Sequence, residues 1–134
     1  MTDTTHERVN ISSGMPWEAR VGFSRAVRIG NLVYTSGTTA MKEGALVGID
    51  DARAQTVQIL ANIKWALEQA GASLADVVRY RVYIVDIDDW TEVARACKEV
   101  FGEIRPCNTL LAVSALIDPA MLVEIEVDAV VSPA

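Results

Sequence analysis

Histidine and cysteine are scarce in this sequence, and their scarcity argues against several kinds of chemistry. His6 is the only histidine among 134 residues, and Cys97 and Cys107, the only cysteines, lack CxxC spacing. A zinc site built from protein ligands and a Ser-His-Asp triad would each need at least one well-placed histidine. The residues therefore argue against both, and two cysteines at this spacing do not indicate a disulfide framework.

Long apolar runs and excess positive charge are also missing. No stretch approaches the roughly 18–20 apolar residues of a membrane span, and eighteen acidic against twelve basic residues give a net charge of −6. This argues against a membrane, and against nucleic acid as the main partner, because a phosphate backbone requires a basic face. Residues 1–8 are polar and mixed in charge, unlike a signal peptide, so we expect a cytoplasmic protein.

The sequence does contain enough apolar material for one domain. Hydrophobic residues make up 51% of the chain, whose length matches a single domain with a buried core. We expect one domain over residues 1–134, in which residues 1–18 form an irregular or partly ordered N-terminal segment. No internal repeat, low-complexity stretch or linker divides the sequence.

Apolar spacing predicts two helices. The first runs from Asp50–Asp51 to Ala70, and the second covers residues 89–101, where Asp89 and Glu92 resemble a capping box. Other runs are rich in β-branched residues or alternate in polarity, and these predict strands. The predicted strands are 19–29, 32–36, 77–86, 109–115 and 122–131, with a tight turn at Gly30-Asn31 and a loop at 41–50.

The order of these elements, strand-strand-loop-helix-strand-helix-strand-strand, predicts an α+β fold with a sheet and both helices packed on one face of it. Two helices cover only one face of a sheet. Residues 83–85 and 110–113 carry apolar side chains at successive positions, so they cannot all face the helices. We therefore expect a second copy of the chain to cover the other face, in a homo-oligomer built through the sheet.

Two loops carry candidate binding residues. Residues 35–39 (Thr-Ser-Gly-Thr-Thr) follow a strand, and their backbone N–H groups suit an anion such as a carboxylate, although the same residue types form ordinary turns. In residues 105–109 (Arg-Pro-Cys-Asn-Thr), Arg105 either binds a carboxylate or faces solvent. Cys107 is interpreted as a small buried hydrophobic residue, since no histidine is available to activate it as a nucleophile.

The last predicted strand carries an acidic row. Glu124, Glu126 and Asp128 share one face because side chains alternate along a strand. Such a row is typical of a solvated outer face, but a carboxylate turned toward a cleft between subunits would have a raised pKa and could transfer protons. Alternatively, basic residues early in the sheet pair with these acids. These residues are Arg20, Arg25 and Arg28.

Four stretches taken together resemble the RidA/YjgF family: RIGNLVYTSGTT (28–39), ALEQAGASLADVVRYRVYIVDIDDW (66–90), IRP (104–106) and LVEIEVDAVV (122–131). The resemblance covers residues 19–131. It implies a chorismate-mutase-like α+β fold and a homotrimer whose sheets line a central barrel, with three pockets between subunits. It further implies hydrolysis of reactive enamines and imines derived from amino acids, with release of ammonia and a 2-keto acid and without a metal or cofactor.

Carried over residue by residue, the resemblance implies a site that matches the family's only in part. Ser36-Gly37, followed by Thr38, matches the family's Ser-Gly turn, and Phe23 falls on a family tyrosine that also lines the pocket. Glu124 matches the glutamate that places the attacking water, and it is the implied catalytic residue. Asn108 falls where the family has the arginine that binds the substrate carboxylate. Losing that charge-assisted contact would cost on the order of 2–5 kcal/mol.

The resemblance is therefore to the arginine-lacking branch of the family, and it implies poor turnover of 2-imino acids unless Arg25 supplies the missing charge. Three functions stay open on the sequence alone. The first is a deaminase or hydrolase of imines, enamines or related carbonyl compounds. The second is a non-catalytic trimer that binds a small metabolite in the same clefts. The third, an endoribonuclease or translation inhibitor, is the least favoured because the net charge is negative.

Overall fold

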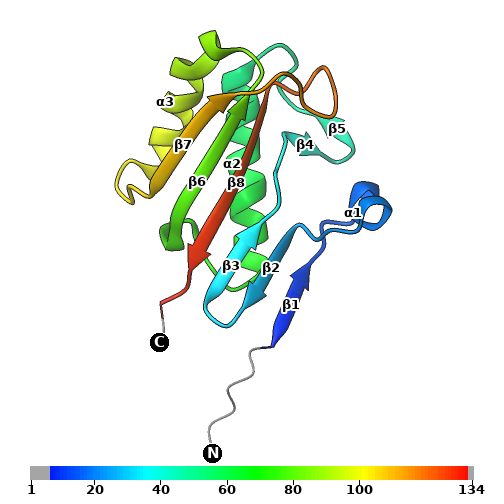
Figure 1. Ribbon diagram of the computed structural model, residues 1–134, viewed down its shortest axis with the longest axis vertical. Coiled ribbons are helices and arrows are strands. Elements are labelled where there is room, and N and C mark those ends of the chain that lie inside the picture. Colours follow the sequence, from blue (N-terminus) through cyan, green and yellow to red (C-terminus); the bar gives the residue numbers. More distant parts are fainter. Residues whose placement is uncertain (1–6, 133–134) are drawn as a thin grey trace, which may run out of the picture.

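The computed structural model describes residues 7–132, so that residues 1–6, with His6, and residues 133–134 lie outside the described part. Two long helices lie on one face of a six-stranded sheet, and a small two-stranded hairpin stands beside it (Figure 1). Within residues 7–132, none of the helices is long and apolar enough to cross a membrane. The elements are β1 (Arg8–Ile11), α1 (Pro16–Val21), β2 (Ala26–Ile29), β3 (Leu32–Thr35), β4 (Met41–Lys42), β5 (Ala45–Leu46), α2 (Ala52–Gln69), η1 (Leu74–Asp76), β6 (Val77–Ile84), η2 (Ile87–Asp89), α3 (Trp90–Phe101), β7 (Cys107–Ala112) and β8 (Val123–Val130).

The sheet order β1-β2-β3-β8-β6-β7 brings the C-terminal strand into the middle. Neighbouring strands are antiparallel except β6 and β7, which run parallel and are joined by the crossover helix α3. Glu124, at the start of β8, lies opposite Tyr83, near the end of β6. A bridge between Thr38 and Ile125 brings the segment after β3 to the same place. Segments far apart in the sequence therefore meet where β8 begins.

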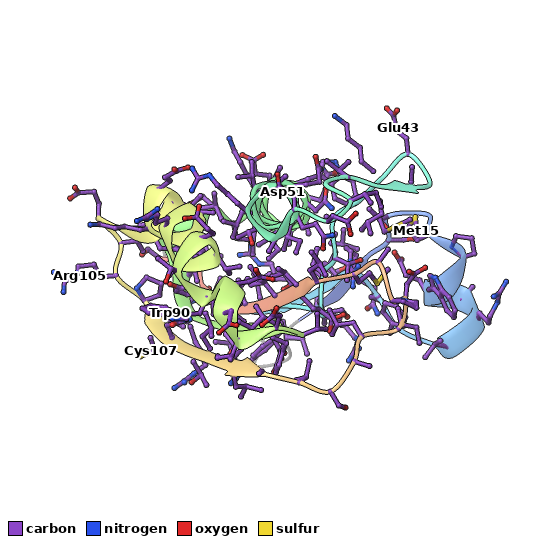
Figure 2. The ribbon with its side chains drawn as sticks, turned by 90° about the horizontal axis from the view of Figure 1, so that it is seen from above. Met15, Glu43, Asp51, Trp90, Arg105 and Cys107 are labelled. Carbon is purple, nitrogen blue, oxygen red and sulfur yellow. The ribbon has the colours of Figure 1, made fainter. Side chains whose placement is uncertain are left out.

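The apolar core lies between the sheet and the helices α2 and α3. Along β8, the residues that face the helices are fully buried, and the acidic residues between them are half-buried on the opposite face. The buried residues are Val123, Ile125 and Val127, and the acidic ones are Glu124, Glu126 and Asp128. This confirms both the alternation predicted along 122–131 and the prediction that two helices cover one face of the sheet (Figure 2).

The sheet face that the helices leave open is charged at its centre. Arg81 lies 3.5 Å from the carboxylate of Asp128 and 4.0 Å from that of Glu126. The hydroxyl of Tyr83 donates a hydrogen bond to Glu126. Arg81 is thus the base that pairs with these two acids. Within the described residues, neither acid forms an ion pair with Arg20, Arg25 or Arg28.

Apolar side chains occupy the margins of this open face rather than all of it. Leu110 packs against the core while Leu111 is exposed, so the apolar run at 110–113 divides between the two faces. Leu111 and two residues of β3 remain exposed on the open side. The β3 residues are Leu32 and Tyr34. The second apolar face that the sequence predicts is therefore apolar only at its margins, because Arg81 and the acidic row occupy its centre.

The strand predicted over residues 19–29 is wrong in its first half. Pro16–Val21 form α1, Gly22 ends it with a left-handed φ of 95°, and only Ala26–Ile29 form a strand. Proline at the start of a helix and glycine after its end are boundary signals, but a helix of 6 residues is too short to show a helical period. Residues 8–11, in the segment expected to be irregular or partly ordered, form β1 and pair with β2.

Two shorter predictions also need correction. The loop predicted at 41–50 contains the β4–β5 hairpin, whose turn residues Glu43 and Gly44 have left-handed φ values of 52° and 82°, as a two-residue hairpin turn requires. The capping box predicted at Asp89 does not form, since the Asp89 side chain makes no capping hydrogen bond. The short 3-10 helix η2, residues 87–89, leads into α3 instead.

Candidate functional site

A cavity of about 840 Å³ lies at the end of the sheet where β8 begins. The helix α1, the β4–β5 hairpin and the loop between β7 and β8 gather at this end (Figure 1). They contribute Trp17, Lys42 and Met121 to the cavity lining. Six of the seven predicted site residues also line it. These are Phe23, Arg25, Ser36, Gly37, Thr38 and Glu124.

The turn Ser36-Gly37-Thr38 is held by its own hydrogen bonds. The Ser36 hydroxyl donates to the carbonyl of Ser24 at 2.7 Å, and the Thr38 hydroxyl donates to the carbonyl of Ser36 at 2.9 Å. The backbone of Thr38 exchanges two hydrogen bonds with Ile125 of β8, at 2.8 and 3.0 Å. Both hydroxyls therefore fix the conformation of this turn. The turn then holds Gly37 against the start of β8.

Any residue other than glycine at position 37 would displace the side chain of Glu124, which fills the space that a Cβ would occupy. A Cβ added at residue 37 would lie 2.8 Å from Cδ of Glu124 and closer still to its carboxylate oxygen. Atoms in a packed protein do not approach so closely without displacement. The Ser-Gly turn thus provides a backbone surface against which the Glu124 carboxylate lies, shielded from water on that side.

Burial raises the pKa of Glu124 above the ordinary value of 4.5, and the nearby charge of Glu126 adds to this effect. The guanidinium of Arg25 acts in the opposite direction but does not cancel it. A carboxyl group with a raised pKa changes its protonation state nearer to neutral pH than an ordinary glutamate does. That property suits a group which gives and takes protons during a reaction.

The raised pKa predicts a pH-dependent difference in stability between the native chain and Glu124→Gln. A carboxyl whose pKa is higher in the folded state favours folding below its unfolded pKa, and that contribution is lost as the pH rises through the folded pKa. Glutamine stays neutral throughout. We expect the two proteins to have similar melting temperatures near pH 4. As the pH is raised to 8, the melting temperature of Glu124→Gln should exceed that of the native chain by a growing amount. Thermal unfolding across this range tests it; a difference independent of pH would contradict it.

Arg25 is a half-buried cation at the start of β2 with unused hydrogen-bonding capacity. Its Nη2 donates to the carbonyl of Gly37 at 2.7 Å, and its guanidinium carbon lies 5.6 Å from the centre of the Phe23 ring. Its Nε is buried and has no hydrogen-bond partner among the described residues. Burial lowers the pKa of Arg25, while Glu18 and Glu124 oppose the shift. Because this Nε is enclosed by the protein, Arg25 offers an anionic ligand in the cavity its positive charge rather than this donor.

Glu18 is a buried acid of α1 that sequence reasoning missed. Its carboxylate accepts hydrogen bonds from the backbone N–H of Ser13, at 3.2 Å, and from the Ser13 hydroxyl. Burial alone would raise the pKa of Glu18, but these bonds, a bond from Ser12 and the charge of Arg25 outweigh it and lower the pKa. Arg25 therefore lies between one carboxylate that stays ionised and a second, Glu124, that gains protons more easily.

Side chains of α2 complete the cavity. Asn62 donates from Nδ2 to the carbonyls of Thr39 and Met41, at 3.0 and 2.9 Å, and so holds the segment between β3 and β4. Trp65, one turn further along α2, contributes an apolar wall. Neither residue could be assigned to the site from the sequence, because their helical positions resemble those of any surface residue.

Asn108 is the predicted site residue that this chain does not bring to the cavity. It lies opposite Tyr80 in the parallel pairing of β6 and β7, and Tyr80 stacks on Phe101 of α3 at 4.4 Å. Its side chain lies on the helix side, where it lines a second cavity of about 570 Å³ together with Cys97 and Arg105. Glu124 lies on the other face of the sheet. Within one chain, the two residues therefore belong to different cavities.

One of the two cysteines differs from its predicted environment. Cys107 is exposed, which corrects the prediction that it is buried, and Cys97 is the buried one. Burial raises the pKa of Cys97 to about 12, so its thiol stays protonated at neutral pH. Arg105 is exposed, with a left-handed φ of 55°. Among residues 7–132, no group of three or more His, Cys, Asp or Glu side chains is placed to hold a metal ion.

The fold and the cavity define a class: a small α+β domain with a carboxyl and a guanidinium at the end of a sheet covered by two helices. A family model described as Endoribonuclease L-PSP matches residues 15–131. A crystal structure of a YjgF/YER057c/UK114 family member from Mycobacterium tuberculosis superposes with a TM-score of 0.86 at 50% identity, over 93% of this chain and 100% of that one. The chain therefore belongs to the RidA/YjgF family.

Two relatives found by sequence agree with this membership. An uncharacterized protein of Streptomyces coelicolor is 40% identical over 119 residues, which are 89% of either chain. The 3-aminoacrylate deaminase RutC of Acinetobacter baylyi is 36% identical over 101 residues, which are 75% of this chain and 79% of the relative. The family resemblance drawn from the four sequence stretches is thus confirmed.

Proposed function

We propose that this chain hydrolyses carboxylate-bearing enamines or imines and releases ammonia. The observation that supports the proposal is that one cavity holds Glu124, whose pKa is raised, and the guanidinium of Arg25, which can bind a carboxylate. In such a reaction the enamine takes a proton on carbon and becomes an iminium ion. Water then adds to the iminium carbon and loses a proton, and in the resulting carbinolamine the hydroxyl proton passes to the amine, which leaves as ammonia and yields a carbonyl compound. The deaminase among the relatives supports this class of reaction.

Glu124 suits the proton transfers, and Arg25 suits the binding of the carboxylate. Protonated Glu124 would give its proton to the enamine carbon and, as a carboxylate, would then take one from the attacking water. A substrate carboxylate would bind the guanidinium of Arg25 through its positive charge and a charge-assisted hydrogen bond. Arg25 would then bind the substrate carboxylate, which is the role that the resemblance assigns to a family arginine at the position of Asn108.

The test is the release of ammonia from freshly generated substrates. We would offer 2-aminoacrylate, and imines made by an amino acid oxidase from alanine, leucine and phenylalanine, and compare ammonia release with the spontaneous rate. At least one should be consumed faster than in buffer, in proportion to the protein added. If none is, the proposed hydrolysis is wrong. Ligands that raise the melting temperature without being consumed would then favour the non-catalytic, metabolite-binding alternative.

We also propose that the open sheet face joins copies of the chain in a homotrimer, as the resemblance implies. The half-buried charges around Arg81, with exposed Leu32, Tyr34 and Leu111 at the margins, support an interface there. The purified protein should sediment at about three times the 14.5 kDa of one chain. Leu111→Asp should weaken the assembly, because it places a charge among the apolar contacts. Sedimentation of the native protein as a single chain at micromolar concentration would refute the trimer.

Cleavage of nucleic acid receives less support, although the description of the family model names an endoribonuclease. The net charge of −6 opposes a phosphate backbone. The cavity itself carries three acidic side chains against two basic ones. The acids are Glu18, Glu43 and Glu124, and the bases are Arg25 and Lys42. Tight RNA binding that persists at about 200 mM salt would contradict this ranking.

A further inference from the structure

Within one chain, the cavity beside Glu124 is larger than a three-carbon substrate requires. Its volume of about 840 Å³ lies within the range of about 300–1,000 Å³ found for sites that enclose drug-sized ligands. A molecule such as 2-aminoacrylate is smaller than a single tryptophan side chain. The charged groups occupy only one part of this space, where Arg25 bonds to Gly37 and Glu124 lies against the same residue.

The rest of the wall is largely aromatic and aliphatic, and it comes from several elements. The apolar side chains are Trp17 of α1, Phe23 after it, Trp65 of α2, and Ile117 and Met121 of the loop before β8. Trp65 is 43% exposed, so it presents a large apolar surface that an apolar ligand group would cover. The Phe23 ring lies beside the guanidinium of Arg25, so the apolar wall begins next to the cation.

From this arrangement we infer that the preferred substrates are carboxylates with a bulky apolar body, aromatic or long and aliphatic, attached to the reacting carbon. This inference rests on the proposed function and names its substrate class. The carboxylate binds Arg25, the reacting carbon lies beside Glu124, and the body packs on Phe23 and Trp65. A three-carbon acid would satisfy the charged groups and leave the apolar wall in contact with water, so it would bind more weakly.

Stable acids test this preference without any chemistry. Titration calorimetry with 3-phenylpropionate and propionate should show at least about tenfold tighter binding of 3-phenylpropionate, the effect of burying one phenyl ring. Trp65→Ala should remove most of this difference. Trp90→Ala is the matched control, because Trp90 is 53% exposed on α3 and does not line the cavity. Equal affinity for the two acids, or a preference unchanged in Trp65→Ala, overturns the inference.

Turnover separates this inference from the proposed function. The imine derived from phenylalanine should be hydrolysed with a kcat/KM at least about tenfold above that of the imine derived from alanine. If 3-phenylpropionate binds more tightly but no imine is hydrolysed, the proposed function fails and the ligand preference stands. If the alanine-derived imine is hydrolysed equally well and the two acids bind equally, the preference fails and the hydrolysis stands.

Discussion

Replacing Glu124 by glutamine should reduce the rate of ammonia release by about 10²–10⁴-fold, the usual contribution of a positioned acid or base. Glutamine has nearly the same size, so it retains the contact with Gly37 and the packing at the start of β8. It cannot, however, give a proton to an enamine carbon or take one from water. The measurement is kcat on whichever imine the native chain hydrolyses fastest.

Glu126→Gln is the matched control for this loss. Glu126 lies two residues further along β8 on the same face, where it bonds to Tyr83 and pairs with Arg81, but it does not line the cavity. Most of the native rate should remain in this variant. An equal loss in both variants would remove Glu124 from the mechanism. Unfolding cannot explain a loss specific to Glu124→Gln, because that variant should be more stable than the native chain at neutral pH.

The elements that could be predicted are those long enough to show a repeating pattern of apolar residues. The helices α2 and α3 and the strands β6 and β8 lie within two residues of their predicted bounds, because eight or more residues suffice to show which face is apolar. β1 has 4 residues and α1 has 6, which is too few for a period. β1 forms because β2 offers it a pairing edge, and such an edge is a tertiary property.

The residues of the site also divide into those with a local signal in the sequence and those without one. Strand alternation placed Glu124 on the face opposite the helices, where burial raises its pKa. Glu18 and Trp65 could not be found, because their roles depend on where α1 and α2 pack. Asn108 was grouped with Glu124 by resemblance alone. The pairing of β6 with β7 assigns it to the other face of the sheet, so only a second copy of the chain could bring the two together.

One buried amide holds two of the loops near the cavity, and no sequence signal revealed it. Gln55 of α2 is fully buried. Its Nε2 donates to the carbonyls of Gly48 and Ala120, at 3.1 and 2.9 Å, and its Oε1 accepts from the backbone N–H of Leu122 at 2.8 Å. Between the last two partners lies Met121, which lines the cavity. A single side chain thus supports both the entry to α2 and the entry to β8.

Gln55→Leu should therefore lower the free energy of unfolding by roughly 2 kcal/mol or more, because the carbonyl of Ala120 and the N–H of Leu122 lose their partner at about 1–3 kcal/mol each, while the carbonyl of Gly48 keeps the N–H of Asp51. For a chain of this size, we expect the melting temperature to fall by roughly 10 °C. Gln69→Leu, an exposed position at the end of the same helix, is the control and should change stability little. If Gln55→Leu melted with the native chain, water would be replacing the amide and these loops would not depend on it. If it melts early, then the activity and the binding of 3-phenylpropionate should fail at a lower temperature than in the native chain, since the loop that carries Met121 is released with the amide.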